Sequence, residues 1–320
     1  MLVTSANEFL RAWSPERFPA VSSATARAAF LVSPHGFALA AESATDNRYM
    51  ANARAADTTG SLDVGSDDVV SIDKDRALAE HAALASALRE SVPIVVFPGD
   101  ATTPDAVFPN NVFATAANRA IVGAMRHEVR RREAGRRDIR AFFSDLLHYE
   151  IIDLSMLPLV AELTGSLVID RARGIAFCGL SERCDLAGAR AMHDAFGLGL
   201  TFAFTLAAGE YHANVVLAQL ASRAVVIAAD GFADRADADA IAHVYAPRVL
   251  WLDGAQKAAF AGNAIALDAH TAWMSARAAA SLTAEQRADL SRWGFDLRSV
   301  DLAEIEKAGG SLRCCVGEIF

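Results

Sequence analysis

The order of apolar and amphipathic segments repeats along this chain, and the repeat restricts the fold more than any other feature. From Ala28 onward, apolar runs of strand length alternate with amphipathic stretches of helix length, which is typical of the α/β class. We expect a first helix at Lys74–Arg89 and a strand at Ile94–Phe97. Beyond them, the order strand, strand, helix, strand recurs with a period of roughly 50 residues, which indicates one supersecondary unit per repeat.

Four units of this kind follow one another. Written as strand, strand, helix and strand, they are expected at Asn111–Thr115, Ala120–Val122, Arg132–Leu147 and Glu150–Ile152; Ser166–Asp170, Gly174–Cys178, Asp185–Phe196 and Thr201–Phe204; His212–Leu217, Ala224–Ala228, Asp234–Tyr245 and Arg248–Trp251; and Asn263–Leu267, Thr271–Met274, Thr283–Trp293 and Phe295–Val300. The N-terminal segment and a C-terminal strand together supply a fifth unit. Such an array closes on itself, with its helices outside and the first strand of each unit near a central axis. Functional residues are therefore expected where these inner strands begin.

The segment before Ala28 lacks this regularity. It contains Pro15, Pro19 and a stretch rich in Ser, Thr and Ala. We predict an irregular N-terminal arm over residues 1–27, followed by a single catalytic domain over residues 28–320.

Composition and charge exclude several classes of protein. The 320 residues carry a formal net charge of −9, so the sequence lacks the basic surface that nucleic-acid binding requires. Apolar runs such as Val215–Leu220 and Ala224–Ala229 are too short to cross a membrane. Met1–Leu10 lacks the basic start of a signal peptide and the four cysteines make no disulfide framework, so we expect a cytoplasmic protein. Zinc-ligand spacings and phosphate-binding glycine loops are missing, so we expect neither a metal nor a cofactor.

Polar residues gather where the inner strands are expected to begin. The four segments concerned are Pro104–Asn111, Glu162–Ser166, Tyr211–Asn214 and Gly309–Cys314. Within them, Glu162, His212 and Cys314 are the components of covalent catalysis, in which a thiol attacks, a base moves protons and a carboxylate orients the base. Each residue alone has an ordinary structural explanation, as a paired acid, a hydrogen-bonded histidine or a small buried hydrophobe. Their joint occurrence at equivalent places of the repeat favours catalysis.

Several segments resemble the guanidino-group-modifying (pentein) superfamily, which includes arginine deiminase, dimethylarginine dimethylaminohydrolase and amidinotransferases. The segments are Pro104–Asn111, Glu162–Asp170, Phe177–Arg183, Tyr211–Val216 and Ile305–Phe320, with the motifs PDAVFPNN, TGSLVIDR and GGSLRC…EIF. Within the superfamily, the sequence is most similar to the arginine-deiminase-related, amidinotransferase-like family that includes the citrulline hydrolase CtlX. The resemblance implies a five-bladed α/β propeller of ββαβ-type units around a pseudo-fivefold axis, with a central active site. It also implies a catalytic set of Cys314, His212 and Glu162.

Three positions depart from the pattern of that family. Leu163 stands where a glycine usually follows the glutamate, Val112 replaces a tryptophan after the paired asparagines, and Cys315 replaces a methionine after the nucleophile. The Cys-Cys pair leaves two thiols to distinguish, and the motif selects Cys314. Arg130 matches a family arginine to which we assign no role.

The residue types around the expected site bear on the substrate. The resemblance implies that Arg183 holds a substrate α-carboxylate, a bidentate contact that suits arginine. Related sites bind a cationic guanidinium through carboxylates. Here asparagines, Asn110 and Asn111 together with Asn214, occupy the corresponding positions. Amides carry no charge and offer both a donor and an acceptor, which suits a neutral ureido group. We therefore expect hydrolysis of a C–N bond of citrulline, through a covalent S-linked intermediate, to ornithine, ammonia and carbon dioxide. Asp105 still supplies a carboxylate, which keeps a guanidino substrate open.

Other functions also stay open. An arginine deiminase or a dimethylarginine dimethylaminohydrolase-like enzyme would act on a guanidino group, and an amidinotransferase would pass the amidino group to an amine instead of water. A non-catalytic binding module is a further alternative, because a ribosome-binding factor shares this architecture. The expected partner is a small amino-acid substrate, and a homodimer is left open. We interpret the basic run Arg126–Arg137, which acidic residues interrupt, as the solvated start of a helix.

Overall fold

The strands of the molecule lie in five separate sheets. The structure is a computed structural model that describes residues 1–50 and 71–320. Within these residues the sheets, each given in its strand order, are β1 (Leu2–Val3), β9 (Leu200–Thr205), β8 (Ile175–Leu180) and β7 (Leu167–Asp170); β4 (Phe113–Ala116), β5 (Arg119–Val122) and β6 (Glu150–Asp153); β10 (Leu217–Leu220), β11 (Ala224–Ala228) and β12 (Val249–Leu252); β13 (Thr271–Ser275) and β14 (Asp296–Val300); and β15 (Gly317–Ile319), β2 (Ala28–Val32) and β3 (Ile94–Phe97). The predicted α/β class is confirmed.

Two kinds of strand pairing follow one another in these sheets. Strand β4 pairs antiparallel with β5, and β5 pairs parallel with β6. The same alternation holds for β7, β8 and β9 and for β10, β11 and β12. A tight turn can join antiparallel neighbours, whereas a parallel neighbour needs a crossover connection, which a helix provides. This is the order strand, strand, helix, strand that the sequence repeats.

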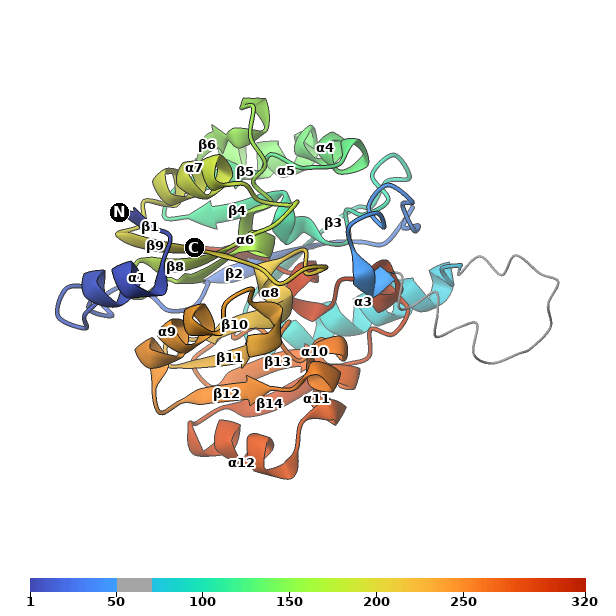
Figure 1. Cartoon of the computed structure of the whole chain (residues 1–320). Coiled ribbons are helices and arrows are strands. Elements are labelled where there is room, and N and C mark those ends of the chain that lie inside the picture. Colours follow the sequence, from blue (N-terminus) through green and yellow to red (C-terminus); the bar gives the residue numbers. More distant parts are fainter. Residues whose placement is uncertain (51–70) are drawn as a thin grey trace.

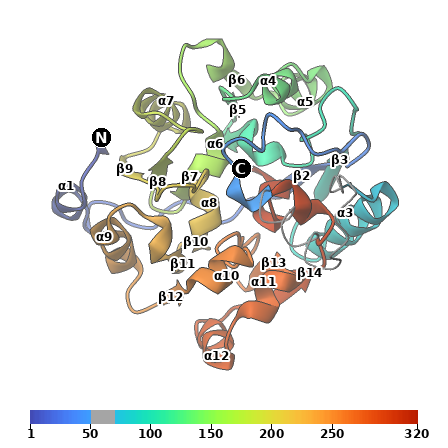
Figure 2. The ribbon, with the colours of Figure 1, turned by 45° about the vertical axis from the view of Figure 1, so that its right-hand side comes forward.

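The larger helices lie on the outside of the molecule. The helices are α1 (Ala6–Ala12), α3 (Lys74–Leu88), α4 (Glu128–Ala134), α5 (Arg137–Ala141), α7 (Leu186–Phe196), α9 (Arg235–Tyr245), α10 (Gly254–Ala258), α11 (Ala276–Ser281) and α12 (Ala284–Arg292). Figures 1 and 2 show α3, α7, α9 and α12 at the periphery, whereas the short helical turns α6 (Leu163–Ser166) and α8 (Ala213–Val216) lie toward the middle. The remaining turns are the 3₁₀ helices η1 (Pro109–Asn111), η3 (Leu154–Met156), η4 (Ala229–Gly231), η5 (Ile305–Ala308) and η6 (Leu312–Cys315), and the π-helical η2 (Phe142–Leu146).

Local side chains set the bounds of the predicted helices. Asp185 accepts a hydrogen bond from the backbone N–H of Gly188 at the start of α7, and Gly197 ends that helix with a φ of +65°. Helix α12 begins with a capping box between Thr283 and Gln286, which satisfies backbone donors at its first turn.

The helix expected at Arg132–Leu147 is instead divided into α4, α5 and η2, and it begins earlier, at Glu128. Gly135 forms the C-cap of α4, where its backbone N–H bonds to the carbonyl of Arg132. A glycine at this place favours a break in the helix because it has little helix propensity.

Two of the expected inner strands begin as helical turns. The segment expected as a strand at His212–Leu217 starts with α8, and the strand expected at Asn111–Thr115 starts only at Phe113, after η1. The chain turns because a backbone N–H bonds to the carbonyl three residues earlier, as Val215 does to that of His212.

The segment expected as a strand at Asn263–Leu267 forms none. A single bridge links Ile265 to Trp273, and the sheet of β13 and β14 has no third strand among the described residues.

The N-terminal segment is more regular than the predicted irregular arm over residues 1–27. Strand β1 pairs parallel with β9, and Ser5 caps α1. Phe9 is fully buried and its ring stacks on Phe202 with 5.0 Å between centroids, and it also contacts Phe177 edge-on. Burial of such a ring and its aromatic contacts contribute to holding α1 against the sheet. Residues 1–27 therefore include a strand and a helix.

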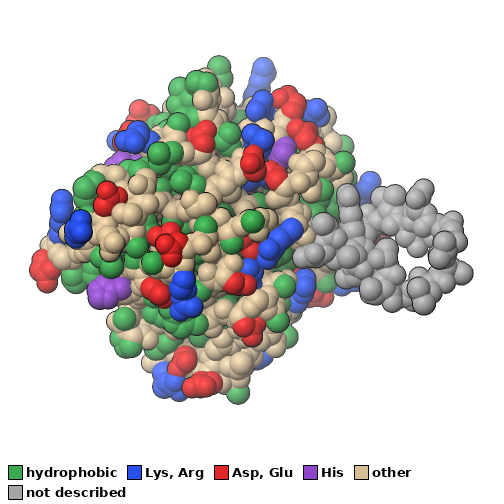
Figure 3. Space-filling view, in the orientation of Figure 1, with side chains coloured by type: hydrophobic (Ala, Val, Ile, Leu, Met, Phe, Trp, Pro, Cys, Tyr) green, Lys and Arg blue, Asp and Glu red, His purple; other side chains and the backbone are tan. Residues whose placement is uncertain are grey.

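The surface mixes both signs of charge. On the face shown in Figure 3, basic and acidic side chains of the described residues are interspersed. None of the helices within residues 1–50 and 71–320 combines the length and the apolar character that crossing a membrane requires.

Candidate active site

Short helical turns carry the predicted site residues into the middle of the molecule. Glu162 is the N-cap of α6, His212 is the N-cap of α8, and Cys314 lies in η6. Turn α6 packs against α8 and against η1, and η1 packs against η6. The turns that precede strands of four different sheets therefore pack together, and the side chains of Glu162, His212 and Cys314 are all buried.

The imidazole of His212 is oriented by Glu162. The His212 Nε2 lies 2.8 Å from the Glu162 Oε2, and the Glu162 Oε1 accepts from the backbone N–H of Arg126 at 3.2 Å. Although burial alone would raise the pKa of Glu162, the Arg183 guanidinium and the hydrogen bond with His212 hold it well below its usual range. An ionised carboxylate only accepts, so Nε2 carries the proton. The Nδ1 atom is buried without a hydrogen-bond partner among the described residues.

Space beside this free nitrogen depends on Gly165. A Cβ at Gly165 would lie 2.9 Å from the His212 Nδ1 and 2.6 Å from the Asn111 Oδ1. Burial lowers the pKa of His212, so the imidazole is neutral at pH 7 and Nδ1 presents a lone pair. The arrangement therefore leaves one nitrogen able to take a proton.

The thiol of Cys314 lies between two amide side chains. Its Sγ is 3.3 Å from the Asn263 Nδ2 and 3.7 Å from the Asn214 Oδ1. Burial raises the pKa of the Cys314 thiol, so the resting side chain is protonated. Cys315 points elsewhere: its Sγ donates to the backbone carbonyl of Ser311 at 3.5 Å.

Cys314 and His212 line the same cavity, which Cys315 does not line. The cavity has a volume of about 20 Å³ and is bordered by Ser43, Asn47, Asp105, Phe108, Asn111, Arg130, Arg183, Tyr211, His212, Ala308, Gly310 and Cys314. This volume holds about one or two water molecules. An amino-acid substrate is therefore too large for the cavity as it stands.

The guanidinium of Arg183 is fully engaged. Its Nε and Nη2 make a bidentate contact with the Asp46 carboxylate at 2.9 and 2.6 Å, and its Nη1 lies 3.2 Å from the Glu162 Oε2. Arg183 is buried and is therefore not a solvated surface residue. Its predicted contact with a substrate carboxylate stays a prediction, and that contact requires Asp46 to leave the same edge of the guanidinium.

Two further charged residues border the cavity. The Asp105 Oδ2 accepts from the Ser43 Oγ at 2.7 Å, and burial raises the pKa of Asp105. Arg130 binds Glu133 through its Nε and Nη2 at 2.6 and 3.1 Å and also donates to the carbonyl of Phe108. The interpretation of Arg126–Arg137 as a solvated helix start is therefore wrong for Arg130, because its pairing with Glu133 allows it to be buried.

The predicted asparagines occupy different positions. Asn111 borders the cavity with an Oδ1 that has no partner among the described residues. The Asn214 Nδ2 donates to the carbonyl of Thr164 at 3.1 Å, which turns its Oδ1 toward the thiol. Asn110 is fully buried and neither atom of its amide is hydrogen-bonded within the described residues, but it does not border the cavity.

Asn263 was missed by the sequence analysis. It stands at the start of the expected fourth unit, as Asn111 stands at the start of the first. This equivalence in the repeat is the signal that could have found it.

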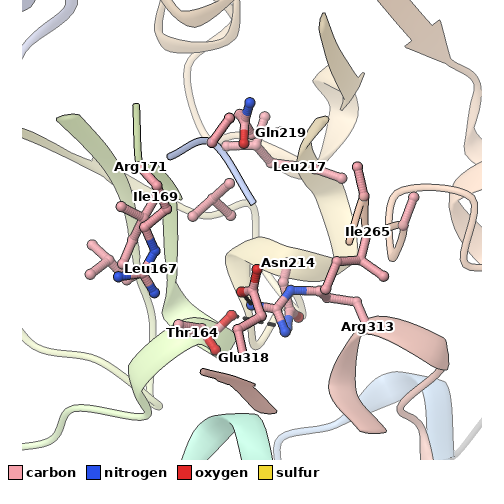
Figure 4. A pocket seen from close by; sticks show the side chains of 15 residues that line it. Thr164, Leu167, Ile169, Arg171, Asn214, Leu217, Gln219, Ile265, Arg313 and Glu318 are labelled. Carbon is pink, nitrogen blue, oxygen red and sulfur yellow. Dashed lines mark hydrogen bonds and ion pairs between the residues drawn. The ribbon is translucent and has the colours of Figure 1, made fainter. Parts of the chain in front are cut away.

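A second cavity lies beside Asn214. Its volume is about 40 Å³, and Thr164, Asn214, Ile265, Arg313 and Glu318 contribute to its wall (Figure 4). An ion pair of 2.9 Å joins Arg313 to Glu318 there. Neither Cys314 nor His212 borders this cavity. Within residues 1–50 and 71–320, no group of three or more His, Cys, Asp or Glu side chains is placed to hold a metal ion.

The family model described as N,N dimethylarginine dimethylhydrolase, eukaryotic, matches residues 33–320. The chain belongs to this family. The predicted membership of the guanidino-group-modifying superfamily is therefore confirmed, and the family is one of hydrolases that act on arginine-type guanidino compounds. None of the curated proteins matches the chain.

Several solved structures share the fold of this chain. The N-terminal domain of ArgZ bound to substrate, an arginine dihydrolase from the ornithine-ammonia cycle in cyanobacteria, has 17% identity and a TM-score of 0.74 over 91% of this chain and 97% of that chain. AgrE with ornithine and NAD+ has 18% identity and a TM-score of 0.75 over 92% of this chain and 39% of that chain. A dimethylarginine dimethylaminohydrolase adduct with 4-chloro-2-hydroxymethylpyridine has 19% identity and a TM-score of 0.67 over 92% and 99%. At these identities the likeness shows the fold.

Proposed function

We propose that this protein is a cysteine-dependent hydrolase that cleaves a C–N bond of a ureido amino acid, converting citrulline to ornithine, ammonia and carbon dioxide. The observation that carries the proposal is that Cys314 and His212 border one buried cavity, with Glu162 holding the far nitrogen of the imidazole. This is the arrangement of a nucleophile, a base and an orienting acid.

The proposed steps assign one task to each group. The Nδ1 of His212 takes the proton of the Cys314 thiol, and the Sγ attacks the trigonal carbon of the substrate to form a covalent S-linked intermediate. Nδ1 passes that proton to the departing nitrogen, which leaves as ammonia, and then takes a proton from the water that attacks the intermediate. The Cys314 sulfur leaves and regains this proton, and the released carbamate of ornithine loses carbon dioxide. Glu162 stabilises the imidazolium that forms each time Nδ1 takes a proton.

The charges around the thiol support a neutral reacting group. The amides of Asn214 and Asn263 contact the Cys314 Sγ, and both oxygens of Glu162 already accept hydrogen bonds. A buried guanidinium cation beside neutral amides would be poorly compensated, whereas a ureido group presents a carbonyl and N–H donors.

A guanidino substrate is the second candidate. Asp105 borders the cavity with a carboxyl group that only Ser43 contacts by hydrogen bonding among the described side chains. The family acts on dimethylarginine, and a solved structure of AgrE holds L-arginine. Conversion of arginine to citrulline, or onward to ornithine, is the activity that these observations favour.

We also propose that the five sheets are the blades of a five-bladed propeller around a pseudo-fivefold axis, as the repeat in the sequence predicts. Four of the sheets carry an antiparallel pair followed by a parallel strand, and the turns that bear Glu162, His212 and Cys314 belong to different sheets.

The test is a panel of citrulline, arginine, methylated arginines and agmatine, scored for ammonia and for the organic product. Ornithine from citrulline is the expected result, and ammonia release without an added amine excludes a transferase. Turnover of arginine with none of citrulline would overturn the ureido assignment. Ornithine from arginine as well as from citrulline would assign the conversion of arginine to citrulline and that of citrulline to ornithine to this site.

Two cysteine variants distinguish the nucleophile. Cys314→Ser is expected to lower kcat by at least about a thousandfold, because a protonated serine hydroxyl is a much weaker nucleophile than a thiolate. Cys315→Ser is the matched control and is expected to retain activity, since its sulfur lies outside the cavity. Unchanged activity of Cys314→Ser would overturn Cys314 as the nucleophile, whereas a wild type without activity on any compound of the panel would leave a binding module as the function.

A further inference from the structure

Asn263 contacts the thiol of Cys314 with a side chain that is completely buried. Its Nδ2 lies 3.3 Å from the Cys314 Sγ and 2.8 Å from the backbone carbonyl oxygen of Asn214. Its Oδ1 accepts from the backbone N–H of Arg313 at 2.9 Å. One amide therefore joins the unit that contains Asn214 to the turn that carries Cys314.

The two backbone partners fix which way this amide faces. A carbonyl oxygen can only accept and a backbone N–H can only donate, so the Nδ2 of Asn263 must face Asn214 and its Oδ1 must face Arg313. The amide nitrogen carries two N–H groups. One is used by the Asn214 carbonyl, and the other is left to point at the sulfur.

The second amide at the thiol faces the opposite way. The Asn214 Nδ2 is held by the carbonyl of Thr164, so Asn214 offers the sulfur its carbonyl oxygen, at 3.7 Å. An oxygen acceptor suits a protonated thiol, whereas an N–H donor suits a thiolate. Among the described side chains, Asn263 is the one whose N–H donates to the Cys314 sulfur.

We propose that Asn263 is a catalytic residue that stabilises the thiolate form of Cys314 by donating a side-chain N–H to its Sγ. The site needs such a donor because burial disfavours the charged sulfur, and a charge-assisted hydrogen bond offsets part of that cost. The inference rests on the proposed role of Cys314 as nucleophile.

The test measures ionisation of the thiol directly, without turnover. In a Cys315→Ala background, the rate of Cys314 alkylation by iodoacetamide is followed against pH by mass spectrometry of the peptide that contains it. Asn263→Ala is expected to raise the pKa of the Cys314 thiol by about one unit or more. At any pH below the thiol pKa, the fraction present as thiolate then falls about tenfold.

Asn263→Asp is a second variant that keeps more of the structure. Its carboxyl still accepts from the backbone N–H of Arg313, but it has at most one proton, which the nearer Asn214 carbonyl takes. The sulfur therefore loses its donor here too, and the thiol pKa is expected to rise. In both variants kcat/KM at neutral pH should fall about tenfold and recover in part at higher pH.

Asn110→Ala is the matched control, because Asn110 is an equally buried asparagine with no contact to the sulfur. It is expected to leave the thiol pKa unchanged. An unaltered thiol pKa in folded Asn263→Ala and Asn263→Asp would overturn the inference. Activity that survives Cys314→Ser would instead refute the proposed function. The alkylation experiment measures the thiol pKa without turnover, so its result does not depend on that outcome.

Discussion

Hydrogen bonds to single atoms set the protonation state of each group around His212. The ionised Glu162 accepts from Nε2 and so directs Nδ1 toward the cavity. The same carboxylate accepts from Arg183, whose other edge is held by Asp46. Glu162 therefore orients the imidazole and neutralises a buried guanidinium at once.

Glu162→Gln is expected to affect both tasks. The amide cannot replace the charge, so kcat should fall by about a hundredfold or more, and the unpaired Arg183 should lower the free energy of unfolding by roughly 3–5 kcal/mol at pH 7. The pKa of Glu162 is lower in the folded chain than its ordinary value of 4.5, so its stabilisation is fully present above that pH and is lost as the pH falls below it.

Chemical denaturation at a series of pH values measures this effect. The difference in free energy of unfolding between the wild type and Glu162→Gln should be largest near neutral pH and shrink below pH 4.5. Glu285→Gln, at an exposed position, serves as the control and should change the free energy by less than about 0.5 kcal/mol. A difference that stays constant with pH would contradict an ionised Glu162 in the fold.

At the scale of elements, the helical turns α6, α8, η1 and η6 determine the site. They precede strands β7, β10, β4 and β15, respectively, and α6 and α8 lie toward the middle of the molecule (Figure 2). Such close packing of turns leaves little room for side chains, and Gly165 in α6 is where the spacing is tightest around His212.

Gly165→Ala is expected to lower kcat at least about tenfold, because its Cβ would lie 2.8 Å from the His212 Cε1 and displace the imidazole or Asn111. Gly135→Ala is the control: a Cβ there meets only the Arg132 carbonyl, at 3.4 Å, and its backbone is not left-handed. Steady-state kinetics of both variants check the prediction. A wild-type kcat in Gly165→Ala would show that the turn can move to accommodate the Cβ without displacing His212 or Asn111.

For the whole molecule, the N-terminal segment contributes to the fold from far outside the site. Strand β1 extends the sheet of β9, and α1 packs against α9 and buries Phe9 in the largest apolar cluster. Phe9 is not among the residues that border the cavity of Cys314, and its ring contacts Phe177 and Phe202.

Phe9→Ala is therefore expected to reduce stability without changing kcat at low temperature. Removal of a fully buried phenylalanine costs roughly 3–5 kcal/mol, which thermal unfolding measures as a lower Tm. Val21→Ala, at a side chain that is 80% exposed, should change the free energy of unfolding by less than about 0.5 kcal/mol. An unchanged Tm for Phe9→Ala would mean that α1 does not contribute to the cooperative fold.

The sequence by itself determined the class of fold, the repeat and the segments that carry Glu162, His212 and Cys314. These follow from the spacing of apolar residues and from caps such as Asp185, which act between residues a few positions apart. Turn α8 and the last residue of η1, Asn111, fell within segments predicted as strands, because a short apolar run does not distinguish a strand from a helical turn.

Only the tertiary structure decided how the charged and amide groups pair. Asp46 binds Arg183 from 137 residues away, and Asn263 reaches Cys314 across 51. Burial of Arg130 against Glu133 likewise depends on the sheets that surround it. Such contacts form only when separate units pack against one another. The spacing of residues along the chain does not show which polar atoms will be buried away from water, or which partners will then satisfy them.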